Sequence, residues 1–321
     1  MVLLKTATVA VFSKGLDRCA IIYVYMDRKQ INVRLTKKQK EHLMTWVLIV
    51  VAVLIFSLIG SAVSKLFPRG GVVEQDKGVS AQAVELPASW GDLGVQMVSV
   101  GVIDRVKFDA LYAGRGGLTA SDKRFLETTV KGNIVVMQEN AGLLLNLLWA
   151  LGLGNKNTIL EQGQMTDPQY GGANRFASTG GWTLSRGDAM NHYSAHTFIT
   201  LTPKQQALVE SVSGNIYRPC CDNPTIFPDC NHGMAMLGLL ELLASQGATE
   251  DQMYKAALQM NSFWFTAQYE NINRYLEMKG RVPSEVSPKE ILGKEYSSAS
   301  GYGKVVSSLP GGKQGGSSCG A

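Results

Sequence analysis

The chain has 321 residues, of which 45% are hydrophobic and 18% are charged, and this composition excludes a disordered or fibrous protein. The formal net charge is +5, but residues 1–65 contain 10 Lys/Arg and 3 Asp/Glu, whereas residues 66–321 contain 21 and 23. The main body is therefore slightly acidic, which argues against a nucleic-acid partner. Five cysteines are too few for a disulfide-rich miniprotein.

Residues 44–64 read MTWVLIVVAVLIFSLIGSAVS and contain no charged residue. A helix needs about 20 apolar residues to cross a bilayer, so this segment predicts a single transmembrane helix in contact with membrane lipid. The basic residues precede it, and the positive-inside rule then places residues 1–43 in the cytoplasm. A cleaved signal peptide is the alternative, but its apolar core would be shorter and nearer the N-terminus.

The chain is therefore expected to be a protein of the bacterial cytoplasmic membrane, with its main domain on the extracytoplasmic side. Residues 1–43 form a basic cytoplasmic segment, and two interpretations remain for residues 1–25: a genuine cytoplasmic segment, or an untranslated extension upstream of a start at Met26. Residues 65–88 contain Pro and Gly and predict a stalk. Residues 89–295 predict an irregular helical bundle, and residues 296–321, rich in Ser and Gly, predict a flexible tail.

The expected fold class is mostly α, since strand-like alternation is nearly absent. A helical pattern begins at Trp90, and residues 134–153 predict a buried core helix, with a second membrane span as the alternative. Residues 163–187, rich in Gly, Asn and Ser, predict a long loop. Further helices are expected at residues 229–245 and 249–279, the latter ended by Gly280. The expected N-caps are Asp104, Thr202 and Thr249, and a further short helix is expected to start at either Thr119 or Ser121.

Three cysteines and three histidines gather within 41 residues: His192, His196, Cys220, Cys221, Cys230 and His232. On a helix, the spacing of His192 and His196 puts both rings on one face. Cys230 and His232 are expected at the start of a helix, where unpaired backbone N–H groups favour a thiolate. Thiolates and imidazoles are ligands that suit Cu(I) or Zn(II). The pattern therefore predicts a six-residue metal site.

Two other interpretations of the cysteines stay open. Cys230 can form a structural disulfide with Cys220 or Cys221, or the thiols can form a redox-active site. Adjacent cysteines are poor partners for one another, because their Cα atoms lie only about 3.8 Å apart. Cys319 lies in the glycine-rich tail, which can bring a further thiol to the cluster.

The segment from Asn215 to Leu258, with its Cys-Cys-x8-Cys-Asn-His-Gly pattern, resembles a family of uncharacterised bacterial membrane-anchored proteins. That resemblance implies a membrane anchor and no activity. Around Cys220, Cys221 and the turn at residues 247–251, the chain is also locally similar to the thiol-reductase subunit of cytochrome c maturation. This similarity implies thiol redox chemistry, but the adjacent cysteines here depart from that family's Cys-x-x-Cys.

The motifs of several enzyme classes are missing from the sequence. It has no Walker A or Rossmann fingerprint, no His-Glu-x-x-His, no nucleophile elbow and no Cys-x-x-Cys-His, so nucleotide and covalent haem cofactors are not expected. We therefore expect an envelope protein that binds or handles Cu or Zn, with an envelope protein as a partner. The alternatives are a thiol–disulfide redox accessory protein and a non-catalytic domain with structural disulfides.

Overall fold

The computed structural model describes residues 83–311. The described residues all belong to one unit of the chain. The predicted membrane helix at residues 44–64, the cytoplasmic segment, most of the stalk and Cys319 lie outside the described residues. Within residues 83–311, no helix combines the length and apolar character needed to cross a bilayer.

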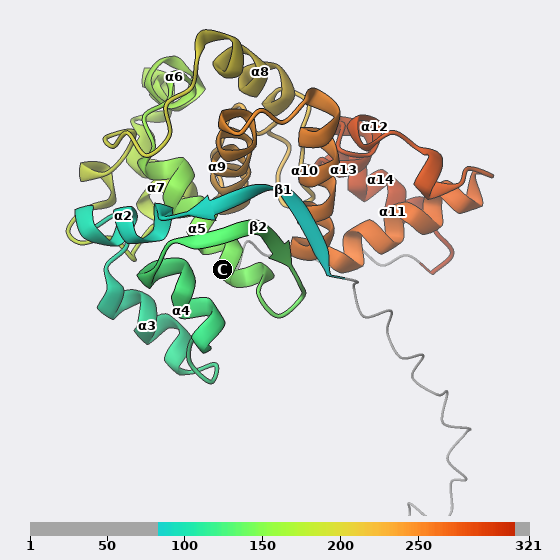
Figure 1. The fold of residues 1–321 in the computed structure, drawn as a ribbon. Coiled ribbons are helices and arrows are strands. Elements are labelled where there is room, and N and C mark those ends of the chain that lie inside the picture. Colours follow the sequence, from blue (N-terminus) through green and yellow to red (C-terminus); the bar gives the residue numbers. More distant parts are fainter. Residues whose placement is uncertain (1–82, 312–321) are drawn as a thin grey trace, which may run out of the picture. The chain divides into compact units, whose positions relative to one another are not determined.

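The described residues form a mostly helical fold with one small sheet, as Figure 1 shows. The elements are β1 (Val84–Gly91), α2 (Leu93–Val100), α3 (Arg105–Ala113), α4 (Ala120–Glu127), β2 (Val130–Val136), α5 (Ala141–Gly154), α6 (Thr158–Gln162), α7 (Ala177–Gly180), α8 (Pro203–Ser213), α9 (Asn231–Ser245), α10 (Glu250–Trp264), α11 (Thr266–Met278), α12 (Pro288–Ile291), α13 (Lys294–Ser297) and α14 (Ala299–Ser308). Five short 3₁₀ turns accompany them: η1 (Gln164–Thr166), η2 (Pro168–Tyr170), η3 (Ala173–Arg175), η4 (Ala189–Asn191) and η5 (Pro283–Glu285).

The two strands pair antiparallel, with Val84 opposite Val136 and Gly91 opposite Val130. Alternate residues of β1 are buried, so one face of the sheet packs against the helices and the other faces outward. This sheet corrects three predictions. The helical pattern expected from Trp90 begins only after the strand, residues 134–136 belong to β2 and not to the expected helix, and residues 84–88 of the predicted stalk belong to β1. The alternation in β1 is short and overlaps the predicted stalk, which explains why the strand was not recognised.

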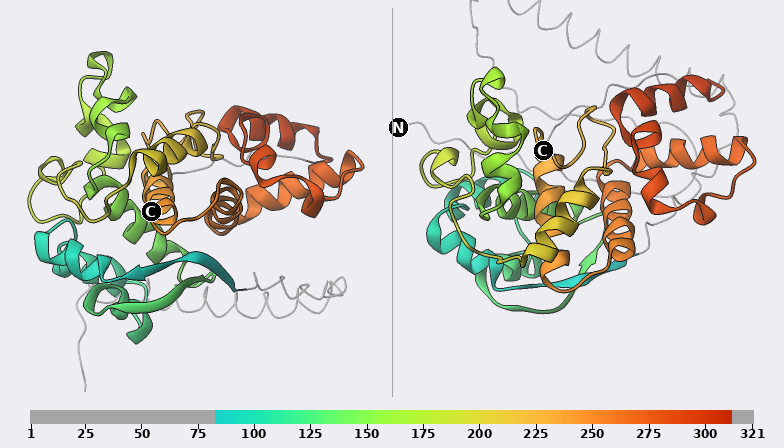
Figure 2. Two further views of the ribbon diagram at one scale, coloured as in Figure 1. Left: turned by 45° about the horizontal axis from the view of Figure 1, so that its top comes forward. Right: turned by 90° about the horizontal axis from the view of Figure 1, so that it is seen from above.

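Helices α5 and α9 form the centre of the core, and nearly every residue of both is buried. Two glycines allow this close packing. A Cβ on Gly152 would lie 2.1 Å from the Met234 carbonyl oxygen, and one on Gly238 would lie 2.4 Å from the Leu148 oxygen. The buried core helix predicted within residues 134–153 is thus confirmed for Ala141–Gly154. The sheet lies across one side of these helices (Figure 2).

The last helices form a second, smaller apolar core beside the first, seen as the orange and red lobe in Figure 2. The helix expected over residues 249–279 is broken at Phe265, whose backbone leaves the helical region at φ −132° and ψ 47°. The flexible tail expected over residues 296–321 is also wrong in part, because α14 covers Ala299–Ser308. Tyr302, Val305 and Val306 of α14 are buried in this second core.

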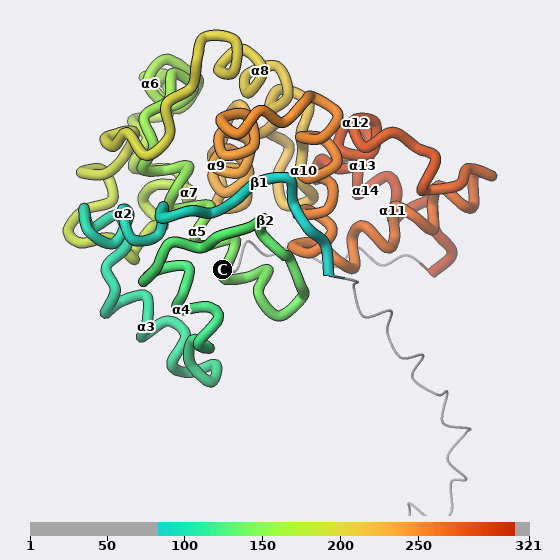
Figure 3. Tube along the Cα trace, in the orientation of Figure 1, coloured from blue at the N-terminus to red at the C-terminus, as the bar shows by residue number. Residues whose placement is uncertain are grey.

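The predicted N-caps are confirmed. The Asp104 side chain accepts hydrogen bonds from two backbone N–H groups at the start of α3, and Thr119, Thr202 and Thr249 each form a capping box. Gly280 adopts φ +74° just after α11, as its predicted role at the helix end requires. The predicted loop over residues 163–187 contains three short 3₁₀ turns and α7, and Figure 3 follows the path of the chain through it.

Candidate metal centre

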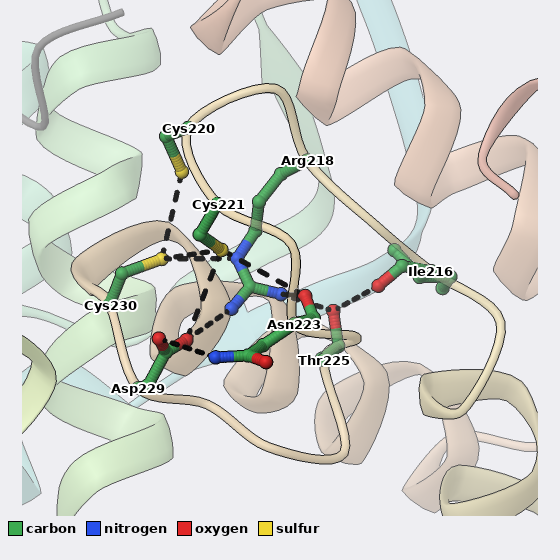
Figure 4. Close-up of polar contacts among 8 residues, drawn as sticks. All are labelled: Ile216, Arg218, Cys220, Cys221, Asn223, Thr225, Asp229 and Cys230. Atoms are coloured by element: carbon green, nitrogen blue, oxygen red, sulfur yellow. Dashed lines mark hydrogen bonds and ion pairs between the residues drawn. The ribbon is translucent and has the colours of Figure 1, made fainter. Parts of the chain in front are cut away.

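Three sulfur atoms, from the loop before α9 and from the residue that caps α9, lie together (Figure 4). The Cys230 Sγ lies 3.7 Å from the Cys220 Sγ and 3.8 Å from the Cys221 Sγ. All three lie within 4.8 Å of one another, and no disulfide joins them. A tetrahedral zinc ion with Zn–S bonds of about 2.3 Å holds its sulfurs about 3.8 Å apart. The observed spacing therefore suits three thiolates that share one ion.

Two segments of the backbone place these sulfurs. Cys230 is the N-cap residue of α9. The loop with Cys220 and Cys221 is closed by the backbone N–H of Cys221, which donates to the Arg218 oxygen, and it is fixed to the start of α14. There, the Ala299 N–H donates to the Cys221 oxygen over 2.9 Å. The helix that replaces the expected flexible tail therefore helps to position the site.

Arg218 is a site residue that the sequence analysis did not identify. It is fully buried, and its Nε–H donates to the Cys230 sulfur over 3.1 Å. One Nη group donates to the Asn223 carbonyl and the other forms an ion pair of 2.9 Å with Asp229. Figure 4 shows the guanidinium between these groups and the sulfurs. Arg218 thus brings a fixed positive charge to the cysteines.

The first turn of α9 is shaped around this arginine. A Cβ on Gly233 would lie 2.4 Å from Nη2 of Arg218, so the guanidinium occupies the space that a larger residue would take. The sequence signal for this arrangement has two parts. An arginine lies two residues before the cysteine pair, and a glycine lies three residues after the third cysteine. The signal is weak, because nothing in it shows that the arginine is buried.

The charges of the cluster influence one another. Burial alone would lower the pKa of Arg218, but the thiolate charges of Cys230, Cys221 and Cys220 outweigh burial and raise that pKa, so the guanidinium stays charged. A hydrogen bond with Cys220 lowers the pKa of Cys221. The hydrogen bond with Cys230 and burial act in the opposite direction and raise this pKa to about 12. Without a metal, Cys221 is therefore expected to be a neutral thiol near pH 7.

His232 lies in the same turn of α9 but outside the group of potential ligands in residues 83–311. Its ring packs against Phe265, with centroids 4.5 Å apart, and against Trp264 at 5.7 Å. Burial lowers the pKa of His232 to about 4, although the Cys230 charge acts to raise it, so the ring is neutral near pH 7. Its Nδ1 has no hydrogen-bond partner in the structure.

His192 and His196 form a pair of their own. Their rings are stacked, with the Nδ1 of His192 3.0 Å from the Nε2 of His196, while the Nε2 of His192 donates to the Arg186 oxygen. The helical face expected for them is absent, because η4 ends at Asn191 and Ser194 adopts φ +50°. Neither histidine belongs to the group of potential ligands, so the structure brings together three of the six predicted residues.

The candidate metal centre is therefore the set Cys220, Cys221 and Cys230, supported by Arg218 and Asp229. Thiolates with a nearby cation can hold a soft metal ion, and two close sulfurs can also undergo thiol–disulfide chemistry. Comparisons of the chain with protein-family models, with curated proteins and with solved structures give no match, so the function is argued from this geometry.

Proposed function

We propose that this protein binds a soft transition-metal ion, Zn(II) or Cu(I), through the thiolates of Cys220, Cys221 and Cys230. The observation that carries the proposal is the grouping of three sulfurs within 4.8 Å of one another, with no disulfide between them. Residues 44–64 would anchor the protein in a bacterial cytoplasmic membrane, where the domain handles metal at the envelope and meets a partner protein there.

The electrostatics support the same assignment. Three thiolates in one place repel one another, and the buried Arg218 reduces that cost by placing its guanidinium against the Cys230 sulfur. Asp229 neutralises the arginine when the thiols are protonated. A metal ion that replaces the thiol protons adds the positive charge that three thiolates require. Binding therefore releases protons, and we expect it to weaken as the pH falls.

A second function is favoured by the same short distances. Cys230 lies close enough to Cys220 and to Cys221 for either pair to close into a disulfide after side-chain rotation. The loss of two electrons and two protons to an oxidant would form that bond, and a reductant would reverse it. The local similarity to the thiol-reductase subunit of cytochrome c maturation also points to this chemistry.

Metal content and a thiol count separate the two functions. The full-length chain, purified with reductant and then dialysed against Zn(II), is expected to retain one zinc per chain and to protect three thiols from alkylation. The triple variant C220S/C221S/C230S should retain none. C19S and H192F are the controls and should both retain the ion. Absence of bound zinc and of bound copper, together with a disulfide that forms and opens reversibly, would reject metal binding in favour of redox chemistry.

A further inference from the structure

The rings of His192 and His196 meet in a contact that the thiol cluster does not use. The Nδ1 of His192 lies 3.0 Å from the Nε2 of His196, and the two rings are stacked with their centroids 5.3 Å apart. His192 is buried, whereas His196 is partly exposed and also stacks on Phe198. Two ring nitrogens therefore face each other beside a partly exposed ring.

The hydrogen bonds of the pair decide which nitrogen carries a lone pair. The Nε2 of His192 lies 3.0 Å from the Arg186 carbonyl oxygen, which can only accept. In the neutral ring, this Nε2 therefore carries the proton and the Nδ1 carries a lone pair that points to His196. Histidines that bind metals commonly donate their other ring N–H to a backbone carbonyl in this way. Burial, and then the neighbouring His192, lower the pKa of His196, which favours the neutral ring that a metal requires.

The backbone holds the two rings in this position. Ser194 lies between them in the sequence and adopts φ +50°, a conformation that residues other than glycine rarely adopt. The Ser194 N–H donates to the Leu153 oxygen over 2.8 Å, and the His196 N–H donates to the Gly154 oxygen over 2.9 Å. Both acceptors belong to the last turn of α5. The pair is therefore attached to a central helix of the core, and its geometry is preorganised.

The distance between the two nitrogens indicates which kind of ion would fit. After a small rotation of the rings, an ion about 2.0 Å from each nitrogen would have them at an angle of about 95°. The angle of about 109° in a tetrahedral zinc site would require about 3.3 Å between the nitrogens. Ions that favour square-planar coordination by nitrogen and oxygen, Cu(II) and Ni(II), prefer about 90°. The pair therefore suits these ions better than it suits zinc.

We propose that the Nδ1 of His192 and the Nε2 of His196 together bind one Cu(II) or Ni(II) ion, with water molecules as the remaining ligands. In the neutral pair, the Nε2 of His196 donates its proton to the Nδ1 of His192. When the ion binds, His196 carries that proton on its own Nδ1 instead, so no proton leaves the pair and both rings stay neutral. Neither histidine belongs to the group of three cysteines, so the site does not depend on the function proposed above.

Titration of the full-length C220S/C221S/C230S variant with Ni(II) tests the proposal, because this variant lacks the thiol cluster and thiols do not reduce Ni(II). We expect calorimetry to give one ion per chain and X-ray absorption at the nickel edge to give two imidazole ligands. Adding H196F should weaken binding by at least about tenfold, since one of the two ligands is lost. Adding H232F is the matched control and should leave binding unchanged, because this ring packs against Phe265 and Trp264.

His192→Gln removes the other ligand and keeps a polar side chain at the buried position, so it gives a second test if H196F lowers the melting temperature. Binding that is weakened in both H196F and H192Q and retained in H232F supports the site. The absence of nickel binding, an affinity that is the same with and without H196F, or a nickel spectrum without imidazole would overturn the proposal and leave the pair as a hydrogen bond alone.

Discussion

Arg218 is the residue on which the geometry of the thiol cluster most depends. It is fully buried and donates hydrogen bonds to the Cys230 sulfur, to the Asn223 oxygen and to Asp229. Removal of one partner from a buried charged network leaves the others unpaired, which costs several kcal/mol. The arginine therefore stabilises the fold as well as the charge of the cysteines.

Replacement of Arg218 by lysine tests this role, because lysine keeps the charge but lacks the planar group that reaches both Cys230 and Asp229. We expect R218K to lower the free energy of unfolding by about 2–4 kcal/mol and to weaken zinc binding. Urea denaturation and zinc titration measure the two effects. R124K, at an exposed position of α4, should change neither. Wild-type stability in R218K would contradict the account.

The buried side chain of Glu241 should make the stability of the folded protein depend on pH. Burial raises its pKa well above the ordinary value of 4.5, and hydrogen bonds with Asn157 and Asn155 offset this only in part. Between pH 4.5 and the folded-state pKa, the folded chain therefore holds one more proton than the unfolded chain. The stability of the wild type relative to E241Q should fall over that range by about 1.4 kcal/mol per pH unit. Urea denaturation from pH 5 to pH 8 measures it, and a difference that does not vary with pH would contradict it.

Among the residues of the candidate site, the three cysteines could be predicted from the sequence, but the side chains around them could not. The spacing of Cys220, Cys221 and Cys230 predicts a shared site because few residues separate them. The addition of His192 and His196 relied on a helix, and the chain leaves the helical conformation at Ser194. Arg218 was missed because burial of a charged side chain depends on contacts distant in the sequence, such as the space left by Gly233.

The close packing of α5 against α9 is the main feature at the scale of the elements. Gly152 and Gly238 lie where the two backbones meet, and a Cβ on either would come within 2.5 Å of a carbonyl oxygen of the other helix. Since both helices are almost wholly buried, neither can move away without disturbing the core. Because Cys230 is the N-cap residue of α9, this packing also positions one of the three cysteines of the cluster.

Substitution of Gly238 by alanine should therefore destabilise the protein. We expect a loss of about 2 kcal/mol or more from overpacking, although alanine favours a helix more than glycine does. G142A is the matched control on α5: its Cβ meets nothing within 4 Å, so it should be neutral or stabilising by up to about 1 kcal/mol. Thermal unfolding of both variants decides the point, and equal melting temperatures would argue against close packing at Gly238.

Local signals predicted the helix starts better than any other part of the fold. Thr119, Thr202 and Thr249 cap their helices through hydrogen bonds within three residues, so the sequence alone contains the necessary information. The break at Phe265 and the helix α14 depend on the second core, which forms from residues far apart in the chain. The sheet was missed for the same reason, since β1 pairs with a strand almost 40 residues later.

For the whole molecule, the thiol cluster connects the two apolar cores. Cys230 caps α9, which belongs to the first core, whereas Cys220 packs against the second. The Cys221 carbonyl oxygen accepts a hydrogen bond from the start of α14. A metal shared by the three cysteines would therefore cross-link both cores. An ion that binds the folded chain and not the unfolded chain stabilises the protein by mass action.

Zinc should accordingly raise the melting temperature of the full-length protein. At a free zinc concentration of 100 times the dissociation constant, the expected gain is about 2.7 kcal/mol. A chelator should reverse the gain, and the melting temperature of C220S/C221S/C230S should not respond to zinc. A wild-type melting temperature that is equal with zinc and with chelator would show that the ion does not join the two cores.

X-ray absorption spectroscopy at the zinc edge of the loaded full-length protein tests the central claim most directly. The account predicts three sulfur neighbours at about 2.3 Å from the metal. It also predicts that C230S reduces the sulfur count by one or releases the ion, whereas H196F leaves the spectrum unchanged. A zinc environment made of nitrogen and oxygen alone, or a sulfur count that is the same in C230S and wild type, would contradict it.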